Sequence, residues 1–494
     1  MKIVIGRYPL RENTICQFET KAGQSAFTSL LNDVIELACG GDIWLMPECE
    51  EEDQAVSFVI HLSALYNAHD HQGKRLTCYL MLHSYDSIRM LQYNDLCKGI
   101  RNNVDVYPFV IDEVWSRNIV LDRIPITLQS EKRVHLVIFG MDDTANIIAM
   151  QAAHIAHYPN YVRDHSLRTR ITMVDTNAEA LSNDLIKRYR HLFDNSYYRV
   201  VKPSEEKAVV SFHKPMYEGE REDFVDVEWE FVAAESWNTG LREKLQLWAK
   251  DQNQILTVVM AHKHAERNIN EACHLPQEVF DCLIPIYIYG QEDIKIVNCP
   301  NIRSFCTSIT RHDTCIPLIR MAKNVNYIYE RCYHENDRKW NGKLRYTVEI
   351  DPQERDRLWA ELPNIKRLSN IYNAMTIRSK MRSVGLEEND WDQFYDIPQQ
   401  DIELLAQVEH NRWSVEKLIM GFRPCNHHEQ EVIASDVKNL KEAYKTKRIH
   451  YDLRAYNDLR SDGTGKPVQI YDLCLSSCLP LIAKDSAILK GEGE

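Results

Sequence analysis

The stretch from 133 to 145 constrains the fold of this chain more than any other part of the sequence. It opens with an apolar run over 134–139, which is typical of a parallel strand buried on both faces, and the run stops at Gly140. A helical pattern of apolar residues follows at once. The first turn of that helix carries three polar residues, Asp142, Asp143 and Thr144. The stretch therefore predicts a buried strand, a tight turn and a helix.

A second apolar run, 170–175, begins about thirty residues after that turn and ends on Asp175. A strand, a turn, a helix and a second strand that ends on an acid form the outline of a dinucleotide-binding unit. In such a unit the helix N-terminus faces phosphate and the acid binds a ribose hydroxyl. The sequence thus predicts a Rossmann-like sheet whose candidate cofactor-binding residues are Gly140, Asp142, Thr144 and Asp175.

The glycine pattern of this unit is incomplete. The G-x-G-x-x-G fingerprint corresponds here to Gly140 through Ala145, with Asp142 in the place of the middle glycine. That glycine normally lets the backbone approach a pyrophosphate. A carboxylate there would repel the ligand by roughly 1 kcal/mol, about as much as the helix terminus attracts it. Two interpretations stay open: an occupied dinucleotide site, and an α/β scaffold that has lost its cofactor.

Composition narrows the class of protein. The chain has 494 residues and a net charge of −13, which argues against a general affinity for nucleic acid or an anionic membrane, because both need a basic face. Its 14 cysteines include no Cys-x-x-Cys pair and no apolar leader opens the sequence, which predicts reduced thiols in a cytoplasmic protein. No run approaches 18 apolar residues, so we expect no membrane insertion.

Strand and helix patterns divide the chain into four predicted parts. We expect an α/β domain over 1–125, a Rossmann-like domain over 130–312, a helical linker region over 313–397 and a small, mainly helical module over 398–485. The predicted fold class is therefore α/β, with parallel sheets followed by that module. The first part is either a degenerate copy of a Rossmann half or an unrelated layer, since buried α/β strands resemble one another.

The expected elements follow from apolar periodicity. The first part has expected strands at 2–5, 42–46, 76–82 and 104–110, and helices at 27–38 and 55–66. The Rossmann-like part has expected strands at 134–139, 170–175, 226–233, 255–260 and 283–289. Its segment 200–226, rich in acids and proline, predicts a loop or hairpin over the sheet edge. Ligands bind at the carboxyl ends of such strands, so His262, Lys263 and His264, which follow the strand at 255–260, are expected at the mouth of the ligand site. Alternatively, these residues cap the next helix.

A long helix is predicted over 401–424 and ends at Gly421. Its residues His410, Trp413 and Lys417 fall three to four positions apart and so share one face. Basic and aromatic residues downstream suit packing against that face. Earlier helices are expected over 316–329, 355–362 and 369–383, the last of them ended by Gly385.

The segment from Glu409 to Pro424, together with 449–459, resembles the RyR domain, the repeat module first described in ryanodine receptors. The matching positions are His410, Trp413, Glu416, Lys417, Gly421, Phe422, His450, Leu453, Tyr456 and Leu459. The Rossmann-like part is similar to the nucleotide-binding domain of potassium-uptake regulators, the TrkA-N type, through Gly140, Ala145 and Asp175. Bacterial chains that join such a domain to a C-terminal RyR domain are a known arrangement.

The RyR resemblance implies a helical module that holds an adenine nucleotide against a tryptophan. The ligand-binding residues it implies are His410, Trp413, Lys417, Phe422, Arg423, His450 and Tyr456. An indole offers a stacking surface worth roughly 1–3 kcal/mol per base, and Lys417, Arg423 and Lys447 suit phosphate. The receptor uses paired repeats whereas this chain has one, so a complete site needs a second subunit or the Rossmann-like domain. Alternatively, Trp413 is a core residue.

Two functions from different classes remain open. The sequence lacks the G-x-S-x-G, Walker and H-E-x-x-H motifs and zinc-type cysteine pairs, so it favours binding over catalysis. We therefore predict a cytoplasmic regulatory protein, homo-oligomeric, that senses an adenine nucleotide or NAD-related ligand, with the N-terminal domain as a candidate surface for a protein partner. The alternative is an NAD(P)-dependent oxidoreductase or nucleotide-processing enzyme with an altered phosphate-binding loop. A role in antiviral or potassium-transport systems is suggested only by the proteins in which such modules are otherwise found.

Overall fold

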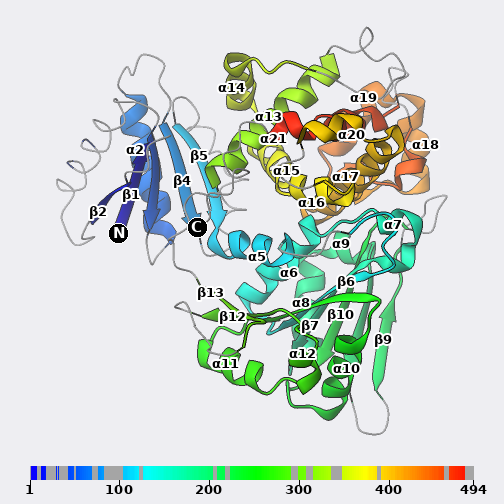
Figure 1. Ribbon diagram of the computed structural model, residues 1–494. Helices are drawn as coiled ribbons and strands as arrows, with labels where there is room; N and C mark the ends of the chain where they lie inside the picture. The colour runs from blue at the N-terminus through cyan, green and yellow to red at the C-terminus, as the bar shows by residue number, and fades with distance from the viewer. Residues whose placement is uncertain are drawn as a thin grey trace. The chain divides into compact units, whose positions relative to one another are not determined.

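The protein is described from a computed structural model, in which the chain divides into two compact units, Met1–Val114 and Trp115–Glu494 (Figure 1). The described residues are 2–7, 13–17, 29, 32, 43–48, 52–68, 76–82, 104–121, 126–203, 208–216, 223–290, 299–306, 315–334, 348–386, 391–460 and 467–483. Each unit is described by itself below.

The first unit contains a five-stranded sheet. Its elements are β1 (Lys2–Arg7), β2 (Asn13–Gln17), β3 (Ile43–Glu48), α2 (Glu52–Asn67), β4 (Leu76–Leu82) and β5 (Val104–Val110), which α5 (Ile111–Leu121) follows. In the order β2-β1-β3-β4-β5, the last three strands are parallel, as predicted. β1 is antiparallel to both of its neighbours, so the prediction of a wholly parallel sheet is wrong at this edge. A connection as short as that between β1 and β2 permits only antiparallel pairing. The expected helix at 27–38 lies almost entirely outside the described residues.

The second unit is built on an eight-stranded sheet in the order β13-β12-β11-β6-β7-β10-β8-β9. Its strands are β6 (Arg133–Phe139), β7 (Thr169–Asp175), β8 (Tyr197–Lys202), β9 (Val209–His213), β10 (Val227–Ala233), β11 (Gln254–Met260), β12 (Ile286–Gly290) and β13 (Ile302–Cys306). All neighbours pair in parallel except β8 and β9. This α/β architecture with a mostly parallel, Rossmann-like sheet confirms the predicted fold class. The five strands expected here are present.

The direction of strand order reverses between β6 and β11. From β6 the chain proceeds to β7, then to β8 and β9 at the far edge, and then back to β10 between β7 and β8. It finally crosses to the other side of β6 to add β11, β12 and β13. The carboxyl ends of the two central strands therefore form a topological switch point, the position at which open α/β sheets bind ligands. The hairpin expected near 200–226 is confirmed as β8 and β9 at the far edge.

Helices cover both faces of this sheet (Figure 1). One face packs against α6 (Asp143–Ile155), α8 (Ala178–Arg188) and α9 (Arg190–Asp194). The opposite face packs against α10 (Thr239–Lys250), α11 (Ala265–Cys273) and α12 (Gln277–Asp281). Short helical turns, α7 (Asn160–Arg163) and η1 (His165–Leu167), precede β7. Two apolar cores, one on each face, result from the alternation of side chains along every strand.

The rest of the second unit is mainly helical. It comprises α13 (Cys315–His334), α14 (Pro352–Glu361), α15 (Asn364–Met375), α16 (Ile377–Ser383), η3 (Trp391–Asp396), α17 (Gln399–Ile419), β14 (Arg423–Pro424), α18 (His427–Ser435), α19 (Val437–Lys445), β15 (Ile449–His450), η4 (Tyr456–Asp458), α20 (Gln469–Ser477) and α21 (Leu479–Ala483). The expected helix at 369–383 is interrupted at Thr376, whose hydroxyl donates to the carbonyl of Asn373. Gly385 and Gly421 have positive φ angles and end their helices as predicted.

Helix α17 belongs to two packing layers at once. It contacts α15 and α20 within the helical part, and α6 and α9 of the sheet part. Its residues Val415 and Leu418 are wholly buried in the same apolar core as Ile148 and Ala152 of α6. Complete burial of each such valine or leucine contributes about 1.5–3 kcal/mol. The sheet and the C-terminal helices of this unit therefore share a core.

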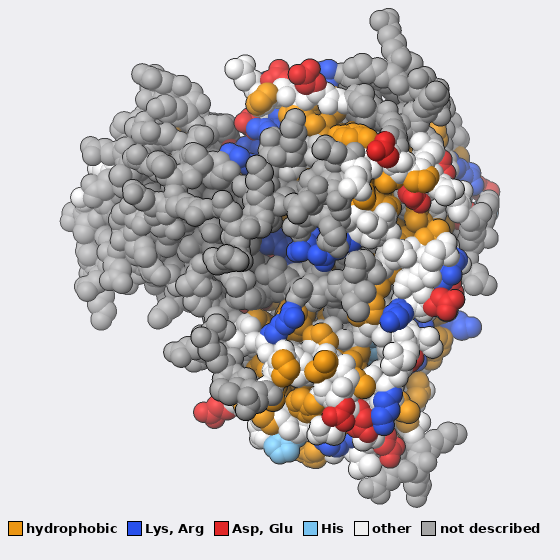
Figure 2. All heavy atoms as spheres, viewed as in Figure 1, with side chains coloured by type: hydrophobic (Ala, Val, Ile, Leu, Met, Phe, Trp, Pro, Cys, Tyr) orange, Lys and Arg blue, Asp and Glu red, His pale blue; other side chains and the backbone are white. Residues whose placement is uncertain are grey.

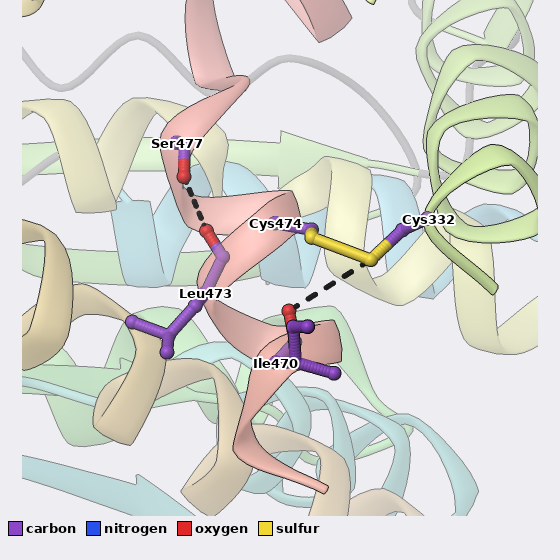
Figure 3. The surroundings of a disulfide bond; sticks show 5 residues. All are labelled: Cys332, Ile470, Leu473, Cys474 and Ser477. Carbon is purple, nitrogen blue, oxygen red and sulfur yellow. Dashed lines mark hydrogen bonds between the residues drawn. A yellow bond between two sulfur atoms is a disulfide. The ribbon is translucent and has the colours of Figure 1, made fainter. Parts of the chain in front are cut away.

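A disulfide bond joins Cys332 of α13 to Cys474 of α20 (Figure 3). Both cysteines are buried, and they lie 142 residues apart in the sequence. The expectation that all thiols are reduced is therefore wrong for this pair. The sequence offered no signal for it, because the partner of Cys474 is remote and the cysteine nearest to Cys474 in the sequence, Cys478, is a buried residue outside this disulfide.

We predict that reducing this disulfide lowers the free energy of unfolding by about 2–4 kcal/mol, because the bond restricts the unfolded chain. Urea unfolding of the wild-type protein with and without dithiothreitol measures the difference. Cys332→Ser should show no further response to the reductant, and Cys478→Ser, the matched control, should respond like the wild type. Equal sensitivity of Cys332→Ser and the wild type would contradict the assignment.

Candidate functional site

The loop after β6 forms the centre of the switch point. Gly140 has a φ of +103°, a conformation that favours glycine. A side chain there would also meet the backbone nitrogen and Nδ1 of His262, both 3.1 Å from an ideal Cβ position. The absence of a side chain at Gly140 therefore lets the loop after β11, and not a ligand, approach the backbone closely.

Asp142 makes hydrogen bonds at the N-terminus of α6. As its N-cap, it accepts a hydrogen bond from the backbone N–H of Ala145 at 3.5 Å. Its other carboxylate oxygen accepts from the backbone N–H of Lys263 at 2.5 Å. Burial raises the pKa of Asp142, although these two hydrogen bonds oppose the shift. The carboxylate thus occupies backbone donors of the kind that a phosphate uses at a helix N-terminus.

The loop after β11 is fixed by buried polar side chains that sequence reasoning missed. Asn268 accepts from the backbone N–H of His262 at 2.8 Å and donates to the carbonyl oxygens of His262 and Tyr289. The buried His262 ring lies 3.0 Å from Glu271. Lys263 is exposed, and His264 precedes α11 without a side-chain capping bond. Of the three residues expected in the mouth, His262 therefore serves to hold the loop.

The structure brings the four predicted cofactor residues to one edge of the sheet. Gly140, Asp142 and Thr144 follow β6, and Asp175 ends the adjacent strand β7. The Asp175 carboxylate is half-buried and accepts a hydrogen bond from the backbone N–H of Asn177 at 2.9 Å. Thr144 is half-buried in the first turn of α6. Their arrangement matches the predicted outline of strand, turn, helix and strand, and the Asp142 carboxylate accepts hydrogen bonds from the chain's own backbone.

We predict that Asp142→Gly allows pyrophosphate groups to reach the loop, because the N–H groups of Lys263 and Ala145 lose their acceptor. The loss of the cap should lower the free energy of unfolding by about 1–2 kcal/mol. Calorimetric titration with NAD, in a chain that also carries Trp413→Ala, should detect binding only with Asp142→Gly. Binding of equal strength when Asp142 is retained would contradict a loop closed by its own carboxylate.

A second group of predicted residues meets around Trp413, and we call it the aromatic cluster: His410, Trp413, Phe422, His450 and Tyr456. The indole is partly buried, with its centroid 5.6 Å from the His410 ring and 4.9 Å from the His450 ring. His450 lies 5.8 Å from Phe422, and His410 lies 5.7 Å from Tyr456. Five of the seven implied RyR residues therefore gather in one place, from α17, the turn that follows it, β15 and η4.

Next to the aromatic cluster, α17 carries a buried ionic network that consists of Lys380, Glu409, Arg412, Glu416 and Lys417. Arg412 donates to Glu409 at 2.9 Å and to Glu416 at 2.6 Å, while Lys380 and Lys417 add bonds of 2.5 and 2.8 Å to the same two carboxylates. Burial raises the pKa of Glu409, and Arg412 and Lys380 outweigh it, so that the pKa is about 2. The network holds three cations and two anions.

Lys417 belongs to both groups. Its ammonium lies 5.9 Å from the centroid of the Trp413 ring, within cation–π range, and it also donates to Ser369 of α15 at 3.3 Å. Burial lowers its pKa. The acids and bases along α17 are spaced three and four residues apart, so that they lie on one side of the helix. This spacing is a sequence signal from which the network could have been predicted.

His410 is the ionisable member of the aromatic cluster. Its Nε2 lies 2.9 Å from the carbonyl oxygen of Arg454, and its Nδ1 lies 3.4 Å from the Asp472 carboxylate. Burial lowers the pKa of His410, but the hydrogen bond and the charge of Asp472 outweigh it, so the pKa is raised. Burial holds the pKa of His450 at about 3, so this ring is neutral at physiological pH. The pKa values of the two imidazoles that flank Trp413 are thus shifted in opposite directions.

The seventh implied RyR residue, Arg423, lies apart from this cluster. Its guanidinium makes a bidentate pair with Glu429, at 2.6 and 2.7 Å, at the N-terminus of α18. Glu429 also accepts from the backbone N–H of Asn426 and completes a capping box. Arg423 therefore has a structural partner, and Lys447 contacts the ring of Tyr444 instead of Trp413.

Comparisons of the chain with protein-family models, with curated proteins and with solved structures find no match. The resemblance to RyR and TrkA-N domains therefore stays a prediction.

Among the residues that the structure describes, no helix has both the length and the apolar character needed to cross a membrane, and no group of three or more His, Cys, Asp or Glu side chains is arranged around a metal position. In the view of Figure 2, basic and acidic side chains are interspersed over the described surface.

We predict that the ion pair of His410 and Asp472 stabilises the fold more at pH 6 than at pH 9, while burial, which raises the pKa of Asp472, weakens the pair at lower pH still. Because the folded pKa of His410 lies above the unfolded value of about 6.5, its contribution is complete below that pH and is lost as the pH rises through the folded pKa. Asp472→Asn should cost about 1.5–3 kcal/mol at pH 6 and much less at pH 9. Urea unfolding at both pH values measures this difference. A cost that is independent of pH would contradict a charged His410.

Proposed function

We propose that this protein is a sensor that binds an adenine-containing nucleotide at the aromatic cluster and passes the signal to its Rossmann-like sheet through α17. One observation carries the proposal: Trp413 is a partly buried indole, flanked by His410 and His450 and accompanied by the Lys417 ammonium. The exposed part of an indole is a flat surface on which a base stacks.

Charge around the cluster supports a ligand with phosphate groups. The adjacent ionic network has one more cation than anions, and every carboxylate in it is already paired. The segment from Lys438 to Arg460, which includes β15, holds seven lysines and arginines and three acids in a chain whose net charge is −13. A nucleotide phosphate next to Trp413 would therefore meet several basic side chains, and the two carboxylates beside the cluster, Asp452 and Asp472, are paired with Lys441 and His410.

The position of α17 supports a sensing role. Trp413 packs against the core that the sheet and the C-terminal helices share, so a ligand on its exposed part acts on that core directly. Across the same junction, His154 of α6 stacks on Tyr372 of α15 at 4.1 Å, and Gln151 donates to the sulfur of Met375. Nδ1 of His154 and Oε1 of Gln151 are buried without a partner among the described residues. Each such atom costs about 1–3 kcal/mol, which favours a junction that rearranges.

The sheet's own switch point supports sensing over dehydrogenase or nucleotide-processing chemistry. In an NAD-dependent enzyme the helix N-terminus binds the pyrophosphate, whereas here Asp142 takes that position with a negative charge. An enzyme with an altered loop remains the alternative. Turnover of NAD, ATP or ADP-ribose by the purified protein would favour that alternative.

The proposal predicts that ATP or a related adenine nucleotide stabilises the wild-type protein and not Trp413→Ala. A ligand at 100 times its dissociation constant adds about 2.7 kcal/mol to the free energy of unfolding. Because Trp413→Ala also removes packing, each variant is compared with its own ligand-free state in a thermal-shift titration. Trp413→Phe, which keeps a smaller stacking surface, should keep part of the shift.

Two further variants separate the sites. Trp237→Ala removes an indole that is 64% exposed at the carboxyl end of β10, and it should leave the ligand-induced shift unchanged. Asp175→Ala should also leave it unchanged if the aromatic cluster is the site. Loss of the shift with Asp175→Ala and its retention with Trp413→Ala would place the ligand on the sheet and overturn the proposal.

A further inference from the structure

Strand β9 exposes an unusual amount of apolar surface. Val209, Val210 and Phe212 are 64%, 53% and 56% exposed, and Met216, just beyond the strand, is 60% exposed. The first three lie on β9, the last strand of the eight-stranded sheet (Figure 1), and Met216 follows the end of that strand. Val210 and Phe212 share one face of the strand, and exposed apolar side chains that lie together mark interaction sites on proteins.

The free edge of β9 lacks the usual protection of an edge strand. Within the described part of the chain, β8 alone pairs with it, so one row of its backbone N–H and C=O groups faces away from the sheet. Natural edge strands normally carry lysine, proline or an inward-pointing charge that discourages further pairing. Residues 208–212 hold none of these, and the first lysine after the strand is Lys214. The strand is therefore suited to main-chain pairing with another strand.

We propose that β9 is a dimer interface, in which it pairs antiparallel with β9 of a second copy of this chain and joins the two sheets into one. The inference is independent of the nucleotide site. Pairing over the full strand Val209–His213 places the twofold axis at its central residue, Ser211. Val210 of each copy then lies opposite Phe212 of the other, and Val209 lies opposite His213.

In this register, the side chains of β9 in one copy are complementary to those of β9 in the other. The pairs of Val210 and Phe212 combine a β-branched with an aromatic side chain, a favourable cross-strand combination, and both lie on the face that Val201 and Arg199 occupy on β8. Lys214 faces Ala208 of the second copy, so no like charges meet between 208 and 214. A parallel arrangement would place each Lys214 beside its counterpart. Self-complementarity and charge thus favour a second copy over an unrelated strand.

The test uses Ser211, the residue that faces its own copy. Ser211→Asp and Ser211→Lys each place like charges directly opposite, and each should weaken the dimer at least tenfold in sedimentation equilibrium. An equimolar mixture of the two variants should restore the dimer, because aspartate then faces lysine. Rescue by mixing cannot result from misfolding of either variant. Ser211→Cys should in addition form an intermolecular disulfide under mild oxidation.

Leu247→Lys is the matched control, because Leu247 is an exposed apolar residue, 70% exposed, on α10 and not on β9. It should leave the dimer intact. A wild-type chain that stays monomeric at about 100 μM, well above the micromolar constant expected of a small interface, overturns the proposal. So does a dimer that both Ser211 variants leave unchanged, or one that the mixture of charged variants fails to restore, since either result removes the twofold pairing at Ser211.

Discussion

The buried ionic network of α17 is the interaction on which the second unit depends. Five charged side chains lie in the interior between α15, α16 and α17, and each carboxylate is bonded to Arg412 and to one lysine. Removing one member of such a network leaves a buried charge uncompensated and costs about 3–5 kcal/mol. The network therefore fixes the rotation of α17 about its axis. That rotation decides which residues of the helix face the sheet and which, including Trp413, remain partly exposed.

The same helix explains how binding in one layer can alter another. Val415 and Leu418 anchor α17 in the core beneath the sheet, while His410 and Trp413 meet β15 and η4 one or two turns earlier. A rigid helix with two such contacts transmits a small shift as a whole, because packed cores are bistable and not continuously deformable. At the switch point of the sheet, the Asp142 carboxylate occupies the backbone N–H groups of Ala145 and Lys263, and for this reason we place the proposed ligand site at α17 and not at that loop.

Sequence patterns predicted the features of this structure that depend on interactions between residues close together in the chain. The buried strand before Gly140, the helix N-terminus at Asp142 and the glycines that end α16 and α17 followed from apolar periodicity and backbone freedom. Strand β13 was missed because it is five residues long and half-buried or exposed at its middle, whereas β8 and β9 were expected only as a loop or hairpin over 200–226, without strand bounds. The interactions of the site were missed for another reason: Asp142 bonds to Lys263, 121 residues away, and such a partner exists only once the chain has folded.

The central claim is that an adenine base lies on Trp413, and photolabelling tests it directly. The purified protein is irradiated with 8-azido-ATP, digested and mapped by mass spectrometry. The account predicts that the label is found on peptides of α17 or of the segment around His450, and that unmodified ATP competes for it. Label on the peptides that contain Gly140 to Ala145 or His262 to His264, with α17 unlabelled, would contradict it.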